Sequence, residues 1–138
     1  MAYDFSGSWS PKAGHHAQLF PASANENSGS AAVDYAISTG FPAAKILLGI
    51  PVYGRSFLGA EGPGRSYRGH GGEDGTFEYK QLPREGTDEI VNTRLVAAFC
   101  VGGDGGFVSY DNPETVKLKA NYCREKRLGV SFLFALLL

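Results

Sequence analysis

The sequence predicts an α/β fold with parallel strands, on three observations. Residues 1–5 form a short apolar and aromatic run that ends at Asp4 and Phe5. Residues 45–53 form a continuous apolar run, which is typical of a strand covered on both faces of a parallel sheet. A helical pattern lies between them, so strand, helix and buried strand follow in the order of a right-handed βαβ unit.

A long loop and a helix join these two predicted strands. Residues 6–29 are rich in Ser, Gly, Ala, Asn and Pro without periodicity, and long ordered loops in compact domains tend to be functional. Ser30 is a suitable N-cap for the helix, because apolar residues at helical spacing follow it. Gly40 should end the helix, with Pro42 just beyond it.

The middle of the chain departs from this pattern. Residues 58–107 contain three glycine-rich clusters, with short aromatic or β-branched stretches between them. Residues 76–79 and 96–101 are the candidate strands. This composition favours an antiparallel insertion over a further βαβ unit.

Helical signals return after the insertion. Asn112 is a good N-cap, Pro113 suits the first helical position, and Gly129 can end the helix. The apolar residues expected on one helix face are Val116, Ala120 and Cys123. The apolar stretch 130–138 predicts a further strand, since a membrane span needs roughly 20 residues.

Composition narrows the function classes. The chain has 138 residues, one domain's worth, with 43% hydrophobic and 20% charged residues, as expected for a globular protein. A net charge of −1 gives no electrostatic reason to expect nucleic acid or an anionic membrane as partner. Cys100 and Cys123 are too few for a disulfide scaffold, and are either free thiols or one bridge. Residues 1–20 lack the pattern of a signal peptide.

Four side chains are candidates for a binding site. Asp4 is the foremost, because a carboxylate in a run otherwise fit for burial is costly unless it is paired or contacts a ligand. Tyr3 beside it adds a phenolic donor, and Arg55 follows the second apolar run. Trp9, the only tryptophan, lies in the long loop, where an aromatic ring can stack on a sugar. The alternatives are a loop-capping Asp4, a surface Arg55 and a Trp9 buried in loop packing.

Other motifs give no cofactor or metal. The glycine clusters contain no phosphate-binding pattern. His15 and His16 are an adjacent pair without further ligands at metal spacing, so they are better explained as loop residues. Asp104, between two glycine pairs, is explained by a tight turn. We therefore expect neither a metal nor a cofactor.

Three motifs in order resemble a known family. Residues 1–5, 7–10 and 14–17 look like the sixth strand and following loop of fungal chitinases of glycoside hydrolase family 18. Residues 45–57, with Tyr53-Gly54-Arg55, are similar to the seventh strand. Residues 108–111, followed by the helix at Pro113, resemble the return from the family's inserted subdomain. The resemblance extends over residues 1 to about 129.

The resemblance implies the C-terminal portion of a (β/α)₈ barrel, about strands 6 to 8, with an inserted α+β subdomain. A whole barrel typically needs roughly 250 residues. Residues 1–57 would form strands 6 and 7 with the intervening helix, residues 58–107 the insertion, and residues 108–138 helix 7 and strand 8.

Family members hydrolyse β-1,4-linked N-acetylglucosamine polymers with retention, and the substrate's own acetamido oxygen attacks the anomeric carbon. Their general acid is a Glu that closes a D-x-x-D-x-D-x-E motif on the fourth strand. None of the fourteen acidic residues here has even D-x-E spacing. The motif precedes Met1 in the family order, as a truncated chain predicts, so we expect this chain alone to be inactive.

By the same resemblance, Tyr3 and Asp4 orient the acetamido group, while Met1 lines the floor of the pocket. Arg55 and Tyr53 would contact substrate, and Trp9 would stack on a sugar. Phe134 stands about where the family has a tryptophan under the sugar, although residues 135–138 match nothing in the pattern.

The expected partner is chitin or a chitooligosaccharide, not nucleic acid or a membrane. Family members are often secreted, but the chain itself does not indicate its compartment or its oligomeric state. Two alternatives to an enzyme fragment stay open, a chitinase-like lectin and a non-functional truncated product.

Overall fold

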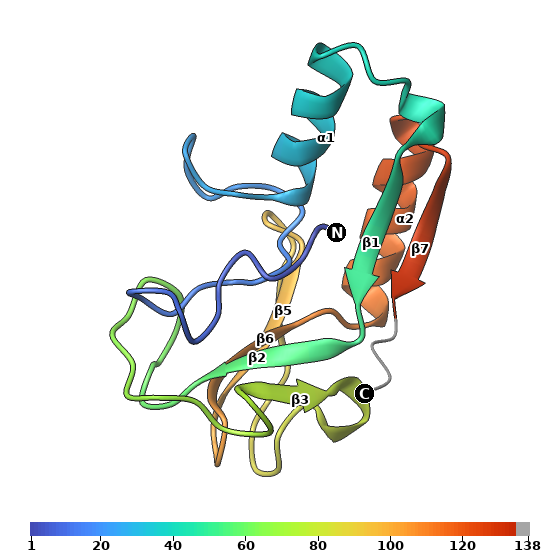
Figure 1. Cartoon of the computed structure of the whole chain (residues 1–138). Coiled ribbons are helices and arrows are strands. Elements are labelled where there is room, and N and C mark those ends of the chain that lie inside the picture. Colours follow the sequence, from blue (N-terminus) through green and yellow to red (C-terminus); the bar gives the residue numbers. More distant parts are fainter. Residues whose placement is uncertain (135–138) are drawn as a thin grey trace.

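The structure is a computed structural model that describes residues 1–134, with side chains described as far as Gly129. The strands form two sheets, a parallel pair and a five-stranded antiparallel sheet (Figure 1). The helices are α1 (Gly29–Ser38) and α2 (Pro113–Glu125), with short 3₁₀ turns at Ala43–Lys45 and Tyr79–Gln81. The strands are β1 (Leu47–Pro51), β2 (Tyr53–Phe57), β3 (Thr76–Glu78), β4 (Ile90–Asn92), β5 (Ala97–Gly102), β6 (Gly106–Tyr110) and β7 (Val130–Phe134).

The parallel pair joins β1 to β7, in register from Leu47 opposite Val130 to Pro51 opposite Phe134. Both lie beside α2 (Figure 1). The strands expected in the apolar runs 45–53 and 130–138 are thus confirmed over shorter lengths. Residues 135–138 lie outside the described residues.

The strand predicted over residues 1–5 does not form. The segment runs beside β1, since a Cβ added to Gly49 would lie 3.5 Å from the Cα of Met1. It makes no ladder with β1, and the backbone N–H of Phe5 instead donates to the carbonyl of His16, at 3.0 Å. The backbone turns at Asp4, whose φ is +61°. The predicted βαβ unit therefore lacks its first strand, and that part of the prediction is wrong.

The run from residue 45 to residue 57 is also not one strand. It divides into β1 and β2 at Val52, and the two halves belong to different sheets. Pro51, which lacks a backbone donor, closes the first half. The division places the side chains of β2 away from the parallel pair.

The antiparallel sheet has the order β3-β2-β6-β5-β4. Its strands β3 and β5 confirm those expected near residues 76–79 and 96–101. The sheet also takes in β2 and β6, with Arg55 opposite Ser109. It therefore extends to both sides of the insertion expected at 58–107, and the three-part division of the chain stays a prediction.

Both helices begin at a side-chain cap. The cap of α1 is Ser28 rather than Ser30, and its Oγ accepts the N–H of Ala31 at 3.2 Å. The helix ends before Gly40, which has a φ of +93°, as the sequence predicts. The N-cap is Ser28 because the helix already includes Ser30 in its first turn.

The cap of α2 is Asn112, as predicted, and its Oδ1 accepts the N–H of Thr115 at 2.9 Å. The hydroxyl of Thr115 accepts the N–H of Asn112 in return, at 2.9 Å. The helix ends at Glu125, with Lys126 as its C-cap, and the chain turns at Arg127, with a φ of +54°, rather than at Gly129.

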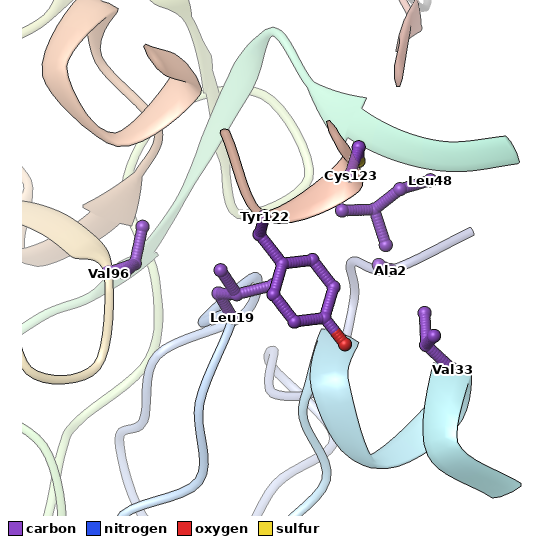
Figure 2. Packing of buried hydrophobic residues seen from close by; sticks show 7 residues of the cluster. All are labelled: Ala2, Leu19, Val33, Leu48, Val96, Tyr122 and Cys123. Carbon is purple, nitrogen blue, oxygen red and sulfur yellow. The ribbon is translucent and has the colours of Figure 1, made fainter. Parts of the chain in front are cut away.

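One hydrophobic cluster joins the first residues of the chain to α1, β1 and α2 (Figure 2). The ring of Tyr122 lies among side chains from the other elements. The buried members are Ala2, Leu19, Val33, Leu48, Val96, Tyr122 and Cys123. This cluster holds the N-terminal segment and the long loop against α2.

Cys123 and Cys100 are both buried and free, so the disulfide alternative is wrong. No helix in residues 1–134 is long and apolar enough to cross a membrane.

Replacing Asn112 tests the cap of α2. Asn112→Ala removes the side-chain acceptor for Thr115 and the hydrogen bond from Nδ2 to Glu89, at 2.7 Å. We expect unfolding free energy to fall by about 1–2 kcal/mol, as for other lost caps. Urea unfolding followed by circular dichroism measures this change. Lys117→Ala, at an exposed position of the same helix, is the control and should change stability by less than about 0.5 kcal/mol.

Candidate functional site

The centre of the candidate site is the carboxylate of Asp4. Its Oδ1 accepts the hydroxyl of Tyr53 at 2.6 Å and Nε of Arg55 at 2.7 Å. Tyr53 and Arg55 are two residues apart on β2, so both side chains lie on one face of the sheet. Gly54 between them faces the core, where a Cβ would lie 2.8 Å from atoms of Leu82 and Val108. The close packing at Gly54 therefore holds the two donors in place.

The backbone of Asp4 is as specific as its side chain. A φ of +61° is uncommon for a residue with a side chain, although Asp tolerates it better than most. The conformation turns the carboxylate from the N-terminal segment toward β2. The side chain stays 37% exposed, so a ligand can reach it.

His16 lies beneath Asp4 and is fully buried. Its Nδ1 accepts the backbone N–H of Asp4 at 3.3 Å and lies 3.7 Å from Oδ1 of the same residue. Its ring centroid lies 5.3 Å from that of Tyr53. Within the described residues, Nε2 of His16 has no hydrogen-bond partner. The sequence predicts only a loop residue at His16, because no spacing rule connects it to Asp4.

The site combines the ionised carboxylate of Asp4 and the guanidinium of Arg55 with two neutral side chains, Tyr53 and His16. Burial favours the neutral form of Asp4, but the hydrogen bonds from Arg55 and Tyr53 and the charge of Arg55 outweigh it and hold the pKa of the carboxyl well below its usual range. Burial and the bond to Asp4 raise the pKa of the Tyr53 hydroxyl, so it remains a donor. Burial lowers the pKa of His16, which is therefore neutral and forms no ion pair with Asp4. Such a group can orient a polar ligand but offers no proton for a leaving group.

Aromatic side chains surround this carboxylate. The rings of Tyr3 and Tyr53 meet edge to face, with centroids 6.2 Å apart. Trp9 is 60% exposed, and the guanidinium carbon of Arg55 lies 4.6 Å from its ring centroid. The Trp9 ring rests on Gly7, where a Cβ would lie 2.4 Å from it. The structure thus brings together Tyr3, Asp4, Trp9, Tyr53 and Arg55.

Met1 and Phe134 are the other two candidate residues. Met1 is 93% exposed and lines an apolar groove between α1 and β1. The backbone of Phe134 pairs with Pro51 at the end of β7, but its side chain lies outside the described part of the chain. Their roles in binding stay predictions.

A segment between β2 and β3, residues 64–67, holds the loop that carries Trp9. The hydroxyl of Tyr67 reaches the carbonyls of Ser8, at 3.1 Å, and Ser10. Ala13 exchanges backbone hydrogen bonds with the same segment, donating to Arg65 at 2.9 Å and accepting from Gly64 at 2.7 Å. The position of Trp9 therefore depends on residues more than fifty positions further along the chain.

Two of the weaker sequence signals have structural explanations. Asp104 accepts two hydrogen bonds from Arg84, each at 2.7 Å, in the turn before β6. His15 packs between Phe99 and Phe107, with ring centroids 5.6 Å and 5.5 Å away. Within the described residues, no three His, Cys, Asp or Glu side chains are grouped as metal ligands.

Burial of His15 makes stability depend on pH. Burial, with the neighbouring His16, lowers the pKa of His15 to about 4, from 6.5. As the pH falls, the unfolded chain binds a proton at His15 before the folded chain does. The contribution of the neutral His15 to the free energy of unfolding is therefore complete above about pH 6.5, and it is lost as the pH falls toward 4. The expected loss is about 3 kcal/mol. Urea unfolding at pH 7 and pH 4.5 measures it, and His15→Gln should reduce the difference.

The exposed His70→Gln is the matched control for this experiment and should keep the pH dependence of the unchanged chain. Equal pH dependence in His15→Gln and the unchanged chain would contradict the assignment. Because the pKa of His16 is lowered as well, some pH dependence should survive in His15→Gln.

Comparison with known proteins agrees with this architecture. The family model described as "Glycosyl hydrolases family 18" matches residues 1–137. "Endochitinase 1" of Metarhizium robertsii is 40% identical over 140 residues, which cover 95% of this chain and 33% of that protein. "Chitinase 1" of Aphanocladium album is 37% identical, over 94% of this chain and 32% of that protein. The chain therefore spans about a third of the length of these relatives.

Solved structures give the same result. The family 18 chitinase of Cycas revoluta in complex with allosamidin has a TM-score of 0.87 and 35% identity, over 98% of this chain and 40% of that one. A mutant of the same enzyme in complex with (GlcNAc)4 also has a TM-score of 0.87, at 34% identity, over 98% of this chain and 41% of that one.

Proposed function

Since this chain belongs to family 18 of the glycosyl hydrolases, we propose that it carries the wall of a chitinase cleft that binds the N-acetyl group of a chitooligosaccharide. The observation that carries the proposal is the ionised Asp4, held by Tyr53 and Arg55 beside an exposed Trp9. Structural neighbours of this chain are described in complex with (GlcNAc)3 and (GlcNAc)4, which supports the ligand class.

The proposal includes the place of the chain in the fold. The parallel pair β1–β7 with α2 beside it would belong to a (β/α)₈ barrel, together with residues 1–5 and α1. The antiparallel strands between residues 58 and 107 would be the inserted α+β subdomain. Residues 1–5 would stand in the place of strand 6, although they form no ladder with β1, and β1 and β7 would be strands 7 and 8.

The site residues would act on the acetamido group of the substrate. In a substrate-assisted mechanism the carbonyl oxygen of this group attacks the anomeric carbon, and positive charge develops on the resulting ring. Asp4 would accept the acetamide N–H and stabilise that charge, because it is already ionised and fixed in place. Tyr3 would donate its hydroxyl to the same group, and Tyr53 would keep Asp4 oriented.

The remaining residues would shape the sugar site. Trp9 offers an exposed ring face for stacking, with Arg55 behind it. Met1 and Phe134 would line the pocket. No acidic residue of the chain stands in a D-x-x-D-x-D-x-E motif, so the proton for the leaving group would not come from this chain.

Titration with a chitin tetramer tests the proposal. We expect calorimetry or chemical-shift changes to show binding, and Trp9→Ala to weaken the affinity about tenfold, the effect of losing roughly 1.4 kcal/mol of stacking. Phe41→Ala is the matched control, since Phe41 is 51% exposed and lies beyond α1. Absence of binding at millimolar tetramer would refute the proposal, and equal losses in both variants would refute the role of Trp9.

Asp4→Asn tests the carboxylate itself. Asn keeps the shape of Asp4 and tolerates a positive φ, but it removes the charge. Because charged hydrogen bonds are stronger than neutral ones, we expect the affinity for the tetramer to fall by about tenfold or more. The chain should remain folded by circular dichroism. An affinity equal to that of the unchanged chain would show that Asp4 does not contact the ligand.

We also expect no hydrolysis of chitin oligosaccharides by the 138-residue chain. The physical reason is that Asp4 is held ionised, while His16 is neutral and buried, so neither donates a proton. Chromatography of a tetramer after long incubation measures this, with a family 18 chitinase as the positive control. Release of the dimer by the purified, unchanged chain would disprove the expectation.

A further inference from the structure

A buried ion pair joins α2 to the residue that follows β6. Nζ of Lys119, on α2, lies 2.6 Å from Oδ2 of Asp111, and the two residues are 1% and 4% exposed. The other oxygen of Asp111 accepts the hydroxyl of Thr115 at 2.8 Å. The sequence pattern does not indicate this pair, because it predicts apolar residues on the buried face of α2. The buried residues of that helix are Thr115, Lys119, Tyr122 and Cys123.

Lys119 also reaches the long loop. Its Nζ donates to the carbonyl of Ala17 at 2.6 Å, a residue 102 positions earlier in the chain. The preceding residue is held from β6, where Oγ of Ser109 accepts the backbone N–H of His16 at 3.0 Å. The backbone of residues 16 and 17 is thus fixed at two neighbouring points by two different elements.

The position of residues 16 and 17 determines the position of the His16 ring. That ring accepts the backbone N–H of Asp4 through Nδ1, and the carbonyl of His16 accepts the N–H of Phe5 at 3.0 Å. Asp111 is therefore connected to Asp4 by the hydrogen bonds of Lys119 to Asp111 and Ala17, the peptide bond between Ala17 and His16, and the hydrogen bond from Asp4 to His16. The loop has no regular secondary structure of its own, so its position depends on such contacts.

Stability alone does not explain a buried ion pair. Replacing such a pair with apolar side chains is often neutral or stabilising, whereas removing one partner alone is strongly destabilising. We infer that Lys119 and Ser109 are positioning residues that fix the His16 ring, and through it the Asp4 carboxylate, for ligand binding. The effect on the ligand rests on the function proposed above.

The variant that tests the inference removes both charges. Asp111→Asn/Lys119→Met leaves no unpaired charge in the interior, and Asn keeps an acceptor for Thr115. It removes the hydrogen bond to Ala17, so the His16 ring should lose its fixed position. We expect changed ¹⁵N shifts of the His16 ring in long-range ¹H–¹⁵N spectra. The affinity for a chitin tetramer should fall between about tenfold and 100-fold, as for other small displacements of site groups.

Lys126→Met is the matched control on the same helix. Lys126 is exposed and lies 3.4 Å from Asp34, away from His16. It should leave both the His16 shifts and the tetramer affinity unchanged. If the double variant does not fold, Ser109→Ala removes the other support of His16 and should change the same ring signals. Unchanged His16 shifts in a folded double variant, or in Ser109→Ala where the double variant does not fold, would overturn the inference.

The two proposals fail in different ways. If the unchanged chain does not bind the tetramer, the proposed function is refuted, and the His16 shifts alone decide the positioning role. If the chain binds but the folded double variant binds equally well, with unchanged His16 signals, the positioning role is refuted and the proposed function stands.

Discussion

The contact between Asp4 and the two donors of β2 organises the site. Asp4 is partly buried, so its charge is costly unless polar groups face it, and Tyr53 and Arg55 supply those groups. The same two residues contact Tyr3 and Trp9, which places the aromatic rings around the carboxylate. The strained backbone at Asp4 is tolerated because these bonds hold it from the other side.

The loop between the N-terminal segment and α1 derives its order from other parts of the chain. Tyr67 holds the segment around Trp9, while Lys119 holds the segment after His16. The loop between β2 and β3 and the helix α2 therefore contribute to the site without lining it. The positioning role inferred for Lys119 would account for a buried lysine on α2.

The sequence predicts correctly those helix ends and strands that depend on neighbouring residues. The cap at Asn112, the stop at Gly40 and the strands in apolar runs follow from the residues themselves. The Tyr3, Asp4, Trp9 and Arg55 candidates also proved to be neighbours. What failed was the pairing of residues 1–5, because a strand exists only with a bonded partner. The roles of His16 and Lys119 were missed because they depend on contacts between distant positions.

Four hydrogen bonds that fix the site join residues far apart in sequence. They link Asp4 to Tyr53 and Arg55, His16 to Ser109, and Ala17 to Lys119, across separations of 49, 51, 93 and 102 residues. Closing loops of this length has an entropic cost that other contacts must offset. The site therefore depends on the antiparallel sheet and α2 being in place. A partly folded chain would hold the sequence motifs without the site.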